Sequence, residues 1–447
     1  MGKKVKDIEK VSSGEKFFIG AEEIFNEGKA ADATILGVLR GKISVGDEVV
    51  LTNPGADEES SRLVSKILEI RIGLEKEADS AADCIVAVKL EKVSSFDLRV
   101  GTVCCSENAE EEEIRNSYLN AIGNAYITNK NCDLSDKDFA AMSLRDCVEI
   151  WKLYASLHLT ILKEEDVEVK RETSEKIGKI INEVCAKLLE AKELLCVFGK
   201  NTEKPYLFSR TMKGKNDYIA TPPDIRVYPL GYENLIKNEY PEDKYVIKKL
   251  KNSDDGKAFY EFFGNAFYAD GACGVDVIYA KTCIADRMLI TPPDFSKLDP
   301  EQYPVINPEL VRWMTLMGQI GRPTTEEDKI SFSLYSGYAS VALMKASFIV
   351  PVKKKDEKGQ SKDSEGNDQL IMPSVDMKQG RPALCIFTDR SRVMEVYPDW
   401  SATIMPLKDI IDKYDAAINL QKNGYVGMYI DAARYNSMAN FVESLKK

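Results

Sequence analysis

Arg381-Pro-Ala-Leu-Cys-Ile-Phe-Thr-Asp-Arg390 is the stretch that decides how the C-terminal part of the chain is expected to fold. Together with Phe348-Ile-Val350 it supplies two short apolar runs rich in β-branched and aromatic residues, a composition typical of strands. Between the two runs, residues 353–368 contain no apolar side chain, so this segment cannot join a core. The pattern predicts two paired strands joined by a solvated arm.

Several features of this region match a known family. They are the Arg-Pro start of the second run, its ending in Phe387-Thr-Asp-Arg390, and the helix-rich segment before Phe348. With these features, residues 301–438 resemble the SseB protein N-terminal domain family. The resemblance implies an α+β domain and names no reaction.

The middle of the chain repeats the same order of landmarks: a helix, an apolar strand, a polar break, and Lys204-Pro leading to a run that ends in Phe208-Ser-Arg210. An ordered match of this kind suggests a degenerate second copy of the SseB-like module. The further matched landmarks are Pro229-Leu230 with Pro406-Leu407 and Gly271 with Gly424.

The N-terminal hundred residues alternate short apolar runs with glycine-containing turns, which favours a small antiparallel barrel. The runs 37–50 and 93–103 are similar to domain 2 of translation GTPases such as elongation factor Tu. In those factors the barrel helps hold aminoacyl-tRNA or touches the ribosome. No G-x-x-x-x-G-K-[ST] loop occurs in the sequence, so we expect the protein neither to bind nor to hydrolyse GTP.

These observations predict a multidomain protein, and its 447 residues suit about three domains. Residues 1–106 are expected to form an all-β barrel like domain 2 of elongation factor Tu. Residues 107–300 are expected to form a helical segment followed by the degenerate SseB-like α+β module. Residues 301–447 are expected to form the SseB-like α+β domain.

Composition narrows the classes of function. The net charge of −11 disfavours a general nucleic-acid binder, and ten scattered cysteines without a C-x-x-C pair favour reduced thiols. The chain has a single histidine, His158, so metal or catalytic sites that need two or more histidines are excluded. No apolar run approaches the roughly 18 residues that span a bilayer, so we expect a cytoplasmic location. We expect no metal, no cofactor and no membrane contact.

The first functional hypothesis is a non-enzymatic bacterial cytoplasmic adaptor that binds other proteins. Hydroxyl, carboxylate and guanidinium groups are expected to emerge together at the end of the strand 383–387, because scaffolds often present contacts where a strand ends. The expected partner-binding residues are Thr388, Asp389, Arg390 and Arg392. Changing both arginines to alanine is expected to leave folding intact.

The second hypothesis is a ribosome- or tRNA-associated accessory factor that acts through the barrel. Its candidate RNA contacts are Arg40, Lys42, Arg71 and Arg99, and a basic patch formed by these residues would favour it. The third hypothesis, an enzyme, would need an exposed and activated thiol or a shifted carboxylate, and Cys273 is the best-placed candidate thiol.

Overall fold

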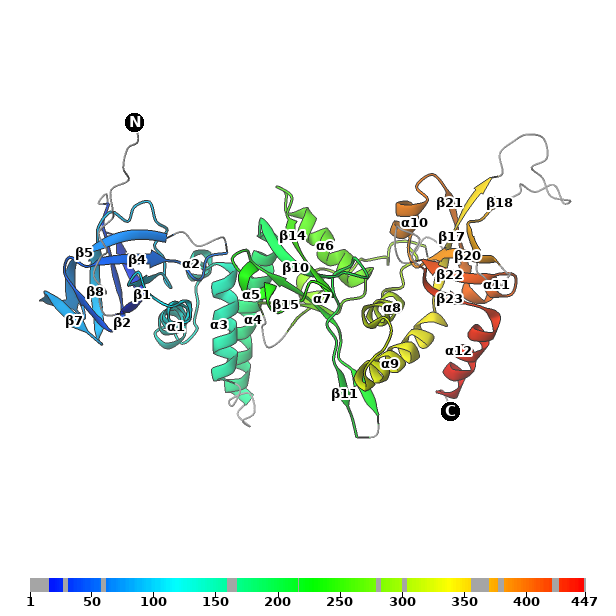
Figure 1. Cartoon of the computed structure of the whole chain (residues 1–447), viewed down its shortest axis with the longest axis horizontal. Helices are drawn as coiled ribbons and strands as arrows, with labels where there is room; N and C mark the ends of the chain where they lie inside the picture. Colours follow the sequence, from blue (N-terminus) through cyan, green and yellow to red (C-terminus); the bar gives the residue numbers. More distant parts are fainter. Residues whose placement is uncertain are drawn as a thin grey trace, which may run out of the picture. The chain divides into compact units, whose positions relative to one another are not determined.

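The computed structural model describes residues 16–26, 31–57, 62–158, 167–215, 217–278, 283–299, 304–354, 370–376, 382–419 and 426–445. The chain forms two compact units, one of residues 1–188 with 229–232 and one of residues 189–228 with 233–447 (Figure 1). The expected solvated arm lies outside the described residues from position 355 onward. Within the described ranges, no helix combines the length and the apolar character needed to cross a bilayer.

The first unit begins with a closed barrel of six antiparallel strands, as expected from the sequence. The strand order is β4-β9-β1-β2-β8-β5, and pairing of β4 with β5 closes the ring. Alternate side chains of the strands fill the interior with an apolar core. The six strands are β1 (Phe18–Asn26), β2 (Ala33–Arg40), β4 (Glu48–Thr52), β5 (Arg62–Ile72), β8 (Ile85–Leu90) and β9 (Val103–Cys105). Three short strands flank them: β3 (Lys42–Ser44), β6 (Lys76–Ala78) and β7 (Ser80–Ala82).

Helices that follow the barrel belong to the same unit. They are α1 (Glu111–Ile122), the π-helix η1 (Gly123–Thr128), α2 (Asp136–Ala141), α3 (Leu144–Leu157) and most of α4 (Val167–Glu190). Ser143 caps α3 through a capping box with Asp146. Helix α1 lies directly on β1 because Gly20 has no side chain: a Cβ atom there would be 2.4 Å from the carbonyl oxygen of Ser117. The helical segment after residue 106 therefore packs with the barrel.

The described residues of the second unit form two large sheets and one two-stranded hairpin, and the first large sheet has the strand order β14-β10-β13-β15-β16. Only the β13–β15 pair is parallel among these neighbours. The strands are β10 (Glu193–Gly199), β13 (Asp224–Tyr228), β14 (Tyr245–Lys251), β15 (Gly274–Val277) and β16 (Ile284–Ala285). The accompanying elements are the hairpin β11 (Thr211–Lys213) and β12 (Tyr218–Ala220), and helices α5 (Glu233–Lys237), α6 (Lys257–Tyr268) and α7 (Asp286–Leu289).

The C-terminal sheet is built around β17 (Ser347–Lys354) and β20 (Pro382–Phe387), which pair with Ile349 opposite Phe387. The expected pairing of the two apolar runs is thus confirmed. The other strands of the C-terminal sheet are β18 (Leu370–Ile371), β19 (Ser374–Asp376), β21 (Ser401–Pro406), β22 (Asp415–Asn419) and β23 (Val426–Ile430). Its helices are α8 (Pro308–Ile320), α9 (Glu326–Leu343), α10 (Arg390–Val396), α11 (Leu407–Ile411) and α12 (Ala432–Ser444).

The two sheets of the second unit share their strand order and their strand directions. The series β21-β17-β20-β22-β23 corresponds to β14-β10-β13-β15-β16, and the third pair of each series is the parallel one. The landmarks chosen from the sequence do not follow this correspondence. The sequence landmarks align residues 204–210 with β20. In the sheet, however, the strand in the position equivalent to β20 is β13, and residues 204–210 form isolated β-bridges instead of a named strand. The hairpin β11–β12 lies between β10 and β13 in the chain, so β13 comes later in the sequence than residues 204–210.

Candidate functional site

The expected recognition cluster at the end of β20 is mostly buried. Thr388 and Asp389 are 0% and 5% exposed, and Arg392 is 3% exposed, so these three side chains do not emerge from the surface. Asp389 instead caps α10, because its carboxylate accepts hydrogen bonds from the Arg392 amide at 3.1 Å and from the Ser391 hydroxyl at 2.5 Å. Of the four predicted residues only Arg390 is exposed.

Arg392 forms the centre of a buried ionic network. Its guanidinium group pairs with Asp389 on the same turn and with Asp270, 2.5 Å away on the segment after α6. Lys204 lies 3.7 Å from the same Asp270 carboxylate. Burial opposes the charge of Arg392, but the two carboxylates outweigh it and raise the pKa of Arg392 above its ordinary value. Because Arg392 is buried and paired, we expect the joint change of Arg390 and Arg392 to alanine to destabilise the fold, contrary to the expectation from the sequence.

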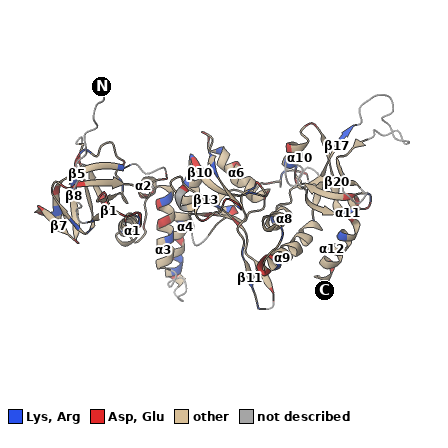
Figure 2. Cartoon of the chain, in the orientation of Figure 1, with Lys and Arg blue, Asp and Glu red and all other residues tan. Residues whose placement is uncertain are grey.

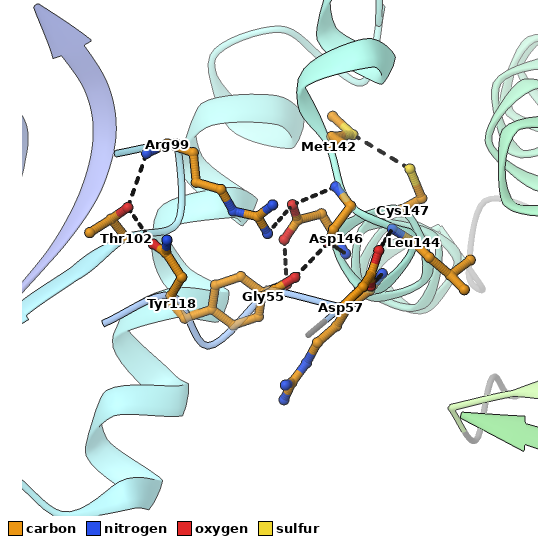
Figure 3. A network of polar contacts seen from close by, with 12 residues as sticks. Gly55, Asp57, Arg99, Thr102, Tyr118, Met142, Leu144, Asp146 and Cys147 are labelled. Atoms are coloured by element: carbon orange, nitrogen blue, oxygen red, sulfur yellow. Dashed lines mark hydrogen bonds and ion pairs between the residues drawn. The ribbon is translucent and has the colours of Figure 1, made fainter. Parts of the chain in front are cut away.

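Arg99 is also committed to an internal contact (Figure 3). Its guanidinium donates to Asp146 Oδ2 at 2.7 Å, and the Tyr118 hydroxyl donates to Asp146 Oδ1 at 2.8 Å. The Asp146 side chain is 3% exposed, and that of Arg99 is 17% exposed. Arg99 therefore joins the barrel to helix α3 and is not available to RNA.

The three remaining candidate RNA contacts do not form one basic patch. Arg71 is exposed but pairs with Glu69 at 2.5 Å and Glu77 at 3.8 Å. Arg40 and Lys42 are exposed. Arg71 pairs with Ala87 of β8, and Ala87 pairs with Leu36 of β2. Leu36 lies four residues before Arg40 on β2, which is a separation of roughly 13 Å along the strand. Elsewhere in the first unit, basic residues also lie beside acidic ones. Figure 2 shows both kinds of residue along helix α4.

An apolar row crosses the C-terminal sheet and ends uncovered at its edge. The register aligns Phe387 with Ile349, and Ile349 with Ile404 on the outer strand β21. Directly opposed residues point to the same face of a sheet. Along this row the exposure rises from 0% at Phe387 through 5% at Ile349 to 53% at Ile404. Ile404 therefore presents an apolar side chain to solvent beside a buried core.

Two aromatic side chains stand next to this row. The Tyr397 ring packs edge-on against Phe387 with centroids 6.0 Å apart, and the Trp400 ring lies 5.0 Å from Tyr397. Both residues are partly exposed. We name Tyr397, Trp400 and Ile404 the α10–β21 corner. Arg390, at the start of α10, makes no ion pair with another described residue.

The backbone of β21 offers a further contact surface. Among the described strands it pairs with β17 alone, so its other side is an open edge. The β21 sequence, Ser401-Ala-Thr-Ile-Met-Pro406, carries no charge. The strand in the equivalent position of the first sheet, β14, carries Lys248, Lys249 and Lys251. Lysines on an edge strand oppose pairing with another chain, so β14 is protected in a way that β21 is not.

The corner residues were missed in the sequence because strand order cannot be read from it. A usable signal was present: Trp400 is one of three tryptophans in the chain, and it immediately precedes an uncharged strand. Aromatic residues are enriched where proteins contact one another.

Among the comparisons with known proteins, a family model matches part of the C-terminal α+β region. Residues 339–436, which include the whole α10–β21 corner, match the family model of the SseB protein N-terminal domain. No curated protein matches the chain. Among solved structures, translation elongation factor SelB from Methanococcus maripaludis, in complex with the GTP analogue GppNHp, is similar with 17% identity and a TM-score of 0.18. That similarity covers 23% of this chain and 21% of the SelB chain.

Proposed function

We propose that the chain is a non-enzymatic adaptor that binds another protein through the α10–β21 corner of its SseB domain. The observation that carries this proposal is the apolar row that ends with Ile404 exposed on an uncharged edge strand. Tryptophan and tyrosine are enriched where proteins bind each other, and the corner supplies one of each.

The corner suits a partner segment in an extended conformation. The open backbone of β21 can pair with such a segment, and Ile404 and Trp400 can bind its apolar side chains. Arg390 is exposed beside them and its planar guanidinium can bind a carboxylate of the partner with two hydrogen bonds. This arrangement replaces the recognition cluster expected from the sequence, of which Arg390 is retained.

The proposal gives the first sheet of the second unit a supporting role. We infer that it is a second, diverged SseB-like module, because it repeats the strand order and directions of the C-terminal sheet. Its lysine-bearing edge strand is protected, and the ionic network of Arg392 and Asp270 fixes it to the C-terminal module. The proposed setting is the bacterial cytoplasm. The proposed function does not involve GTP, since the sequence lacks a phosphate-binding loop.

A ribosome- or tRNA-associated role would depend on a basic patch on the barrel. Arg71 pairs with nearby glutamates and Arg99 is bound to Asp146, so two of the four candidate residues are already engaged. Binding to phosphate backbones rests on clustered cations. The placement of these residues gives this second function no support.

Affinity purification of the full-length chain from its native host tests the adaptor proposal. Ile404→Lys places a charge at the end of the apolar row, and we expect it to reduce recovery of the main protein partner by about tenfold. The matched control is Val246→Lys on β14, the equivalent edge strand, where Val246 is also exposed. Mass spectrometry of bound protein and RNA measures the recovery. Equal loss in both variants, no loss in either, or recovery of RNA in place of a protein would contradict the proposal.

A further inference from the structure

A groove runs between helix α1 and the outer face of the barrel. Two adjoining hollows of about 140 and 240 Å³ share Arg40 and Ser117 and together form this groove. Gly20 and Phe18 of β1 lie at its base, and Val38 and Arg40 of β2 form the strand wall. The close approach of α1 to Gly20 holds the helix wall in place.

Asparagines form the helix wall. Asn116, Asn120 and Asn124 lie four residues apart, so they share one face of α1 and its π-helical continuation. From Glu113 to Asn124 the wall spans eleven residues, or roughly 16 Å at the helical rise. An extended peptide advances about 3.3 Å per residue, so the groove accommodates about five residues of a peptide.

The polar groups at the middle of the groove are not engaged with other described residues. Arg40, Asn116 and Asn120 make no ion pair or side-chain hydrogen bond there, whereas Asn124 donates to Glu22 at 2.7 Å. Amide side chains both donate and accept, which matches the alternating groups of a peptide backbone. The guanidinium of Arg40 supplies one positive charge between them.

The charges of the groove distinguish a peptide from a nucleic acid. Arg40 is its one uncommitted cation among the described residues, since Lys16 pairs with Glu110. Glu22 and Glu113 stand at its two ends. A chain of phosphates would meet one unpaired cation, one lysine already paired with glutamates and two carboxylates, whereas a peptide with a single central carboxylate would place it opposite Arg40.

We propose that the α1–β2 groove is a second binding site, which takes an extended peptide segment with one aspartate or glutamate opposite Arg40. The peptide backbone bonds to Asn116 and Asn120, and the ends of the segment are neutral or basic. This site is on the first unit and is independent of the α10–β21 corner on the second. Together with the corner in the proposed function, it gives the chain two separate sites for protein segments.

The test uses the full-length chain and a phage-displayed library of random heptapeptides. Wild type and Lys42→Glu are expected to enrich peptides with an acidic residue at one position, because Lys42 is exposed next to the groove but does not line it. Arg40→Glu is expected to select a basic residue at that position instead. Synthetic peptides from the wild-type selection should bind Arg40→Glu about tenfold more weakly by fluorescence anisotropy.

A labelled single-stranded RNA 12-mer is measured in parallel, and thermal unfolding verifies that each variant folds. Arg40 is exposed and makes no ion pair with a described residue, so the substitution itself should leave the unfolding temperature unchanged. Three outcomes would overturn the proposal: no enriched peptide family, enrichment that does not respond to Arg40→Glu, or RNA binding that depends on Arg40.

Discussion

Arg392→Ala is expected to lower the free energy of unfolding of the second unit by about 3–5 kcal/mol, the usual cost of removing one partner from a buried ion pair. The guanidinium is the shared partner of Asp389 and Asp270, and both carboxylates are largely buried. Its removal leaves Asp389 without a cation and leaves Asp270 with only Lys204, 3.7 Å away. The network also joins α10 to the segment after α6, so the loss should weaken both sheets of the unit.

Urea unfolding followed by tryptophan fluorescence measures this effect. Trp313 and Trp400 lie in the second unit and Trp151 in the first, so a Trp151→Phe background reports the second unit alone. Arg390→Ala is the matched control, since Arg390 is on the same helix but exposed, and it should change stability by less than about 0.5 kcal/mol. Equal stability of the Arg392 and Arg390 variants would show that the buried network does not contribute.

Arg99→Ala should destabilise the first unit by about 3 kcal/mol, because it leaves the buried Asp146 carboxylate without its cation. The Tyr118 hydroxyl and the Ser143 amide still donate to Asp146, so we expect the cost to be at the low end of the range for such pairs. If Arg99 instead contacted RNA from an exposed position, this variant would unfold like wild type.

A Trp313→Phe, Trp400→Phe background isolates the Trp151 signal of the first unit for this measurement. Arg40→Ala is the control, since Arg40 is exposed on the same barrel and makes no ion pair with a described residue. The prediction is a shift of the urea midpoint for Arg99→Ala alone. Identical midpoints for the Arg99 and Arg40 variants would contradict it.

The sequence predicted the elements whose causes are local. Glycine turns between short apolar runs predicted the barrel, and two β-branched runs predicted the pairing in which Ile349 lies opposite Phe387. These features depend on periodicity and turn chemistry, which neighbouring residues determine.

Arginine environments could not be predicted in this way. Arg392 meets Asp270, which is 122 residues earlier, and Arg99 meets Asp146, which is 47 residues later. Nothing local marks these carboxylates as partners. A local signal did exist for Asp389, because Thr-Asp-Arg-Ser-Arg before an apolar residue is also a helix start with aspartate as the N-cap. The same residues also fit an exposed strand end, which is the structure expected in the sequence analysis.

The candidate binding site depends on strand order, which is a property of the whole sheet. Ser401-Ala-Thr-Ile-Met-Pro406 is a strand in any arrangement, but only its place beside β17 with an open second side makes Ile404 an exposed end of a buried row. The same limit applies to the landmarks at residues 204–210, because the strand in the position equivalent to β20 is β13, which follows the β11–β12 hairpin.

Hydrogen–deuterium exchange of the full-length chain, with and without the partner recovered by affinity purification, tests the central claim most directly. A partner strand added to β21 would engage backbone amides that face solvent in the free protein. The account predicts slower exchange across residues 401–406 on binding, with β14 at residues 245–251 unchanged. Unchanged exchange at 401–406, with protection elsewhere in the chain, would contradict it.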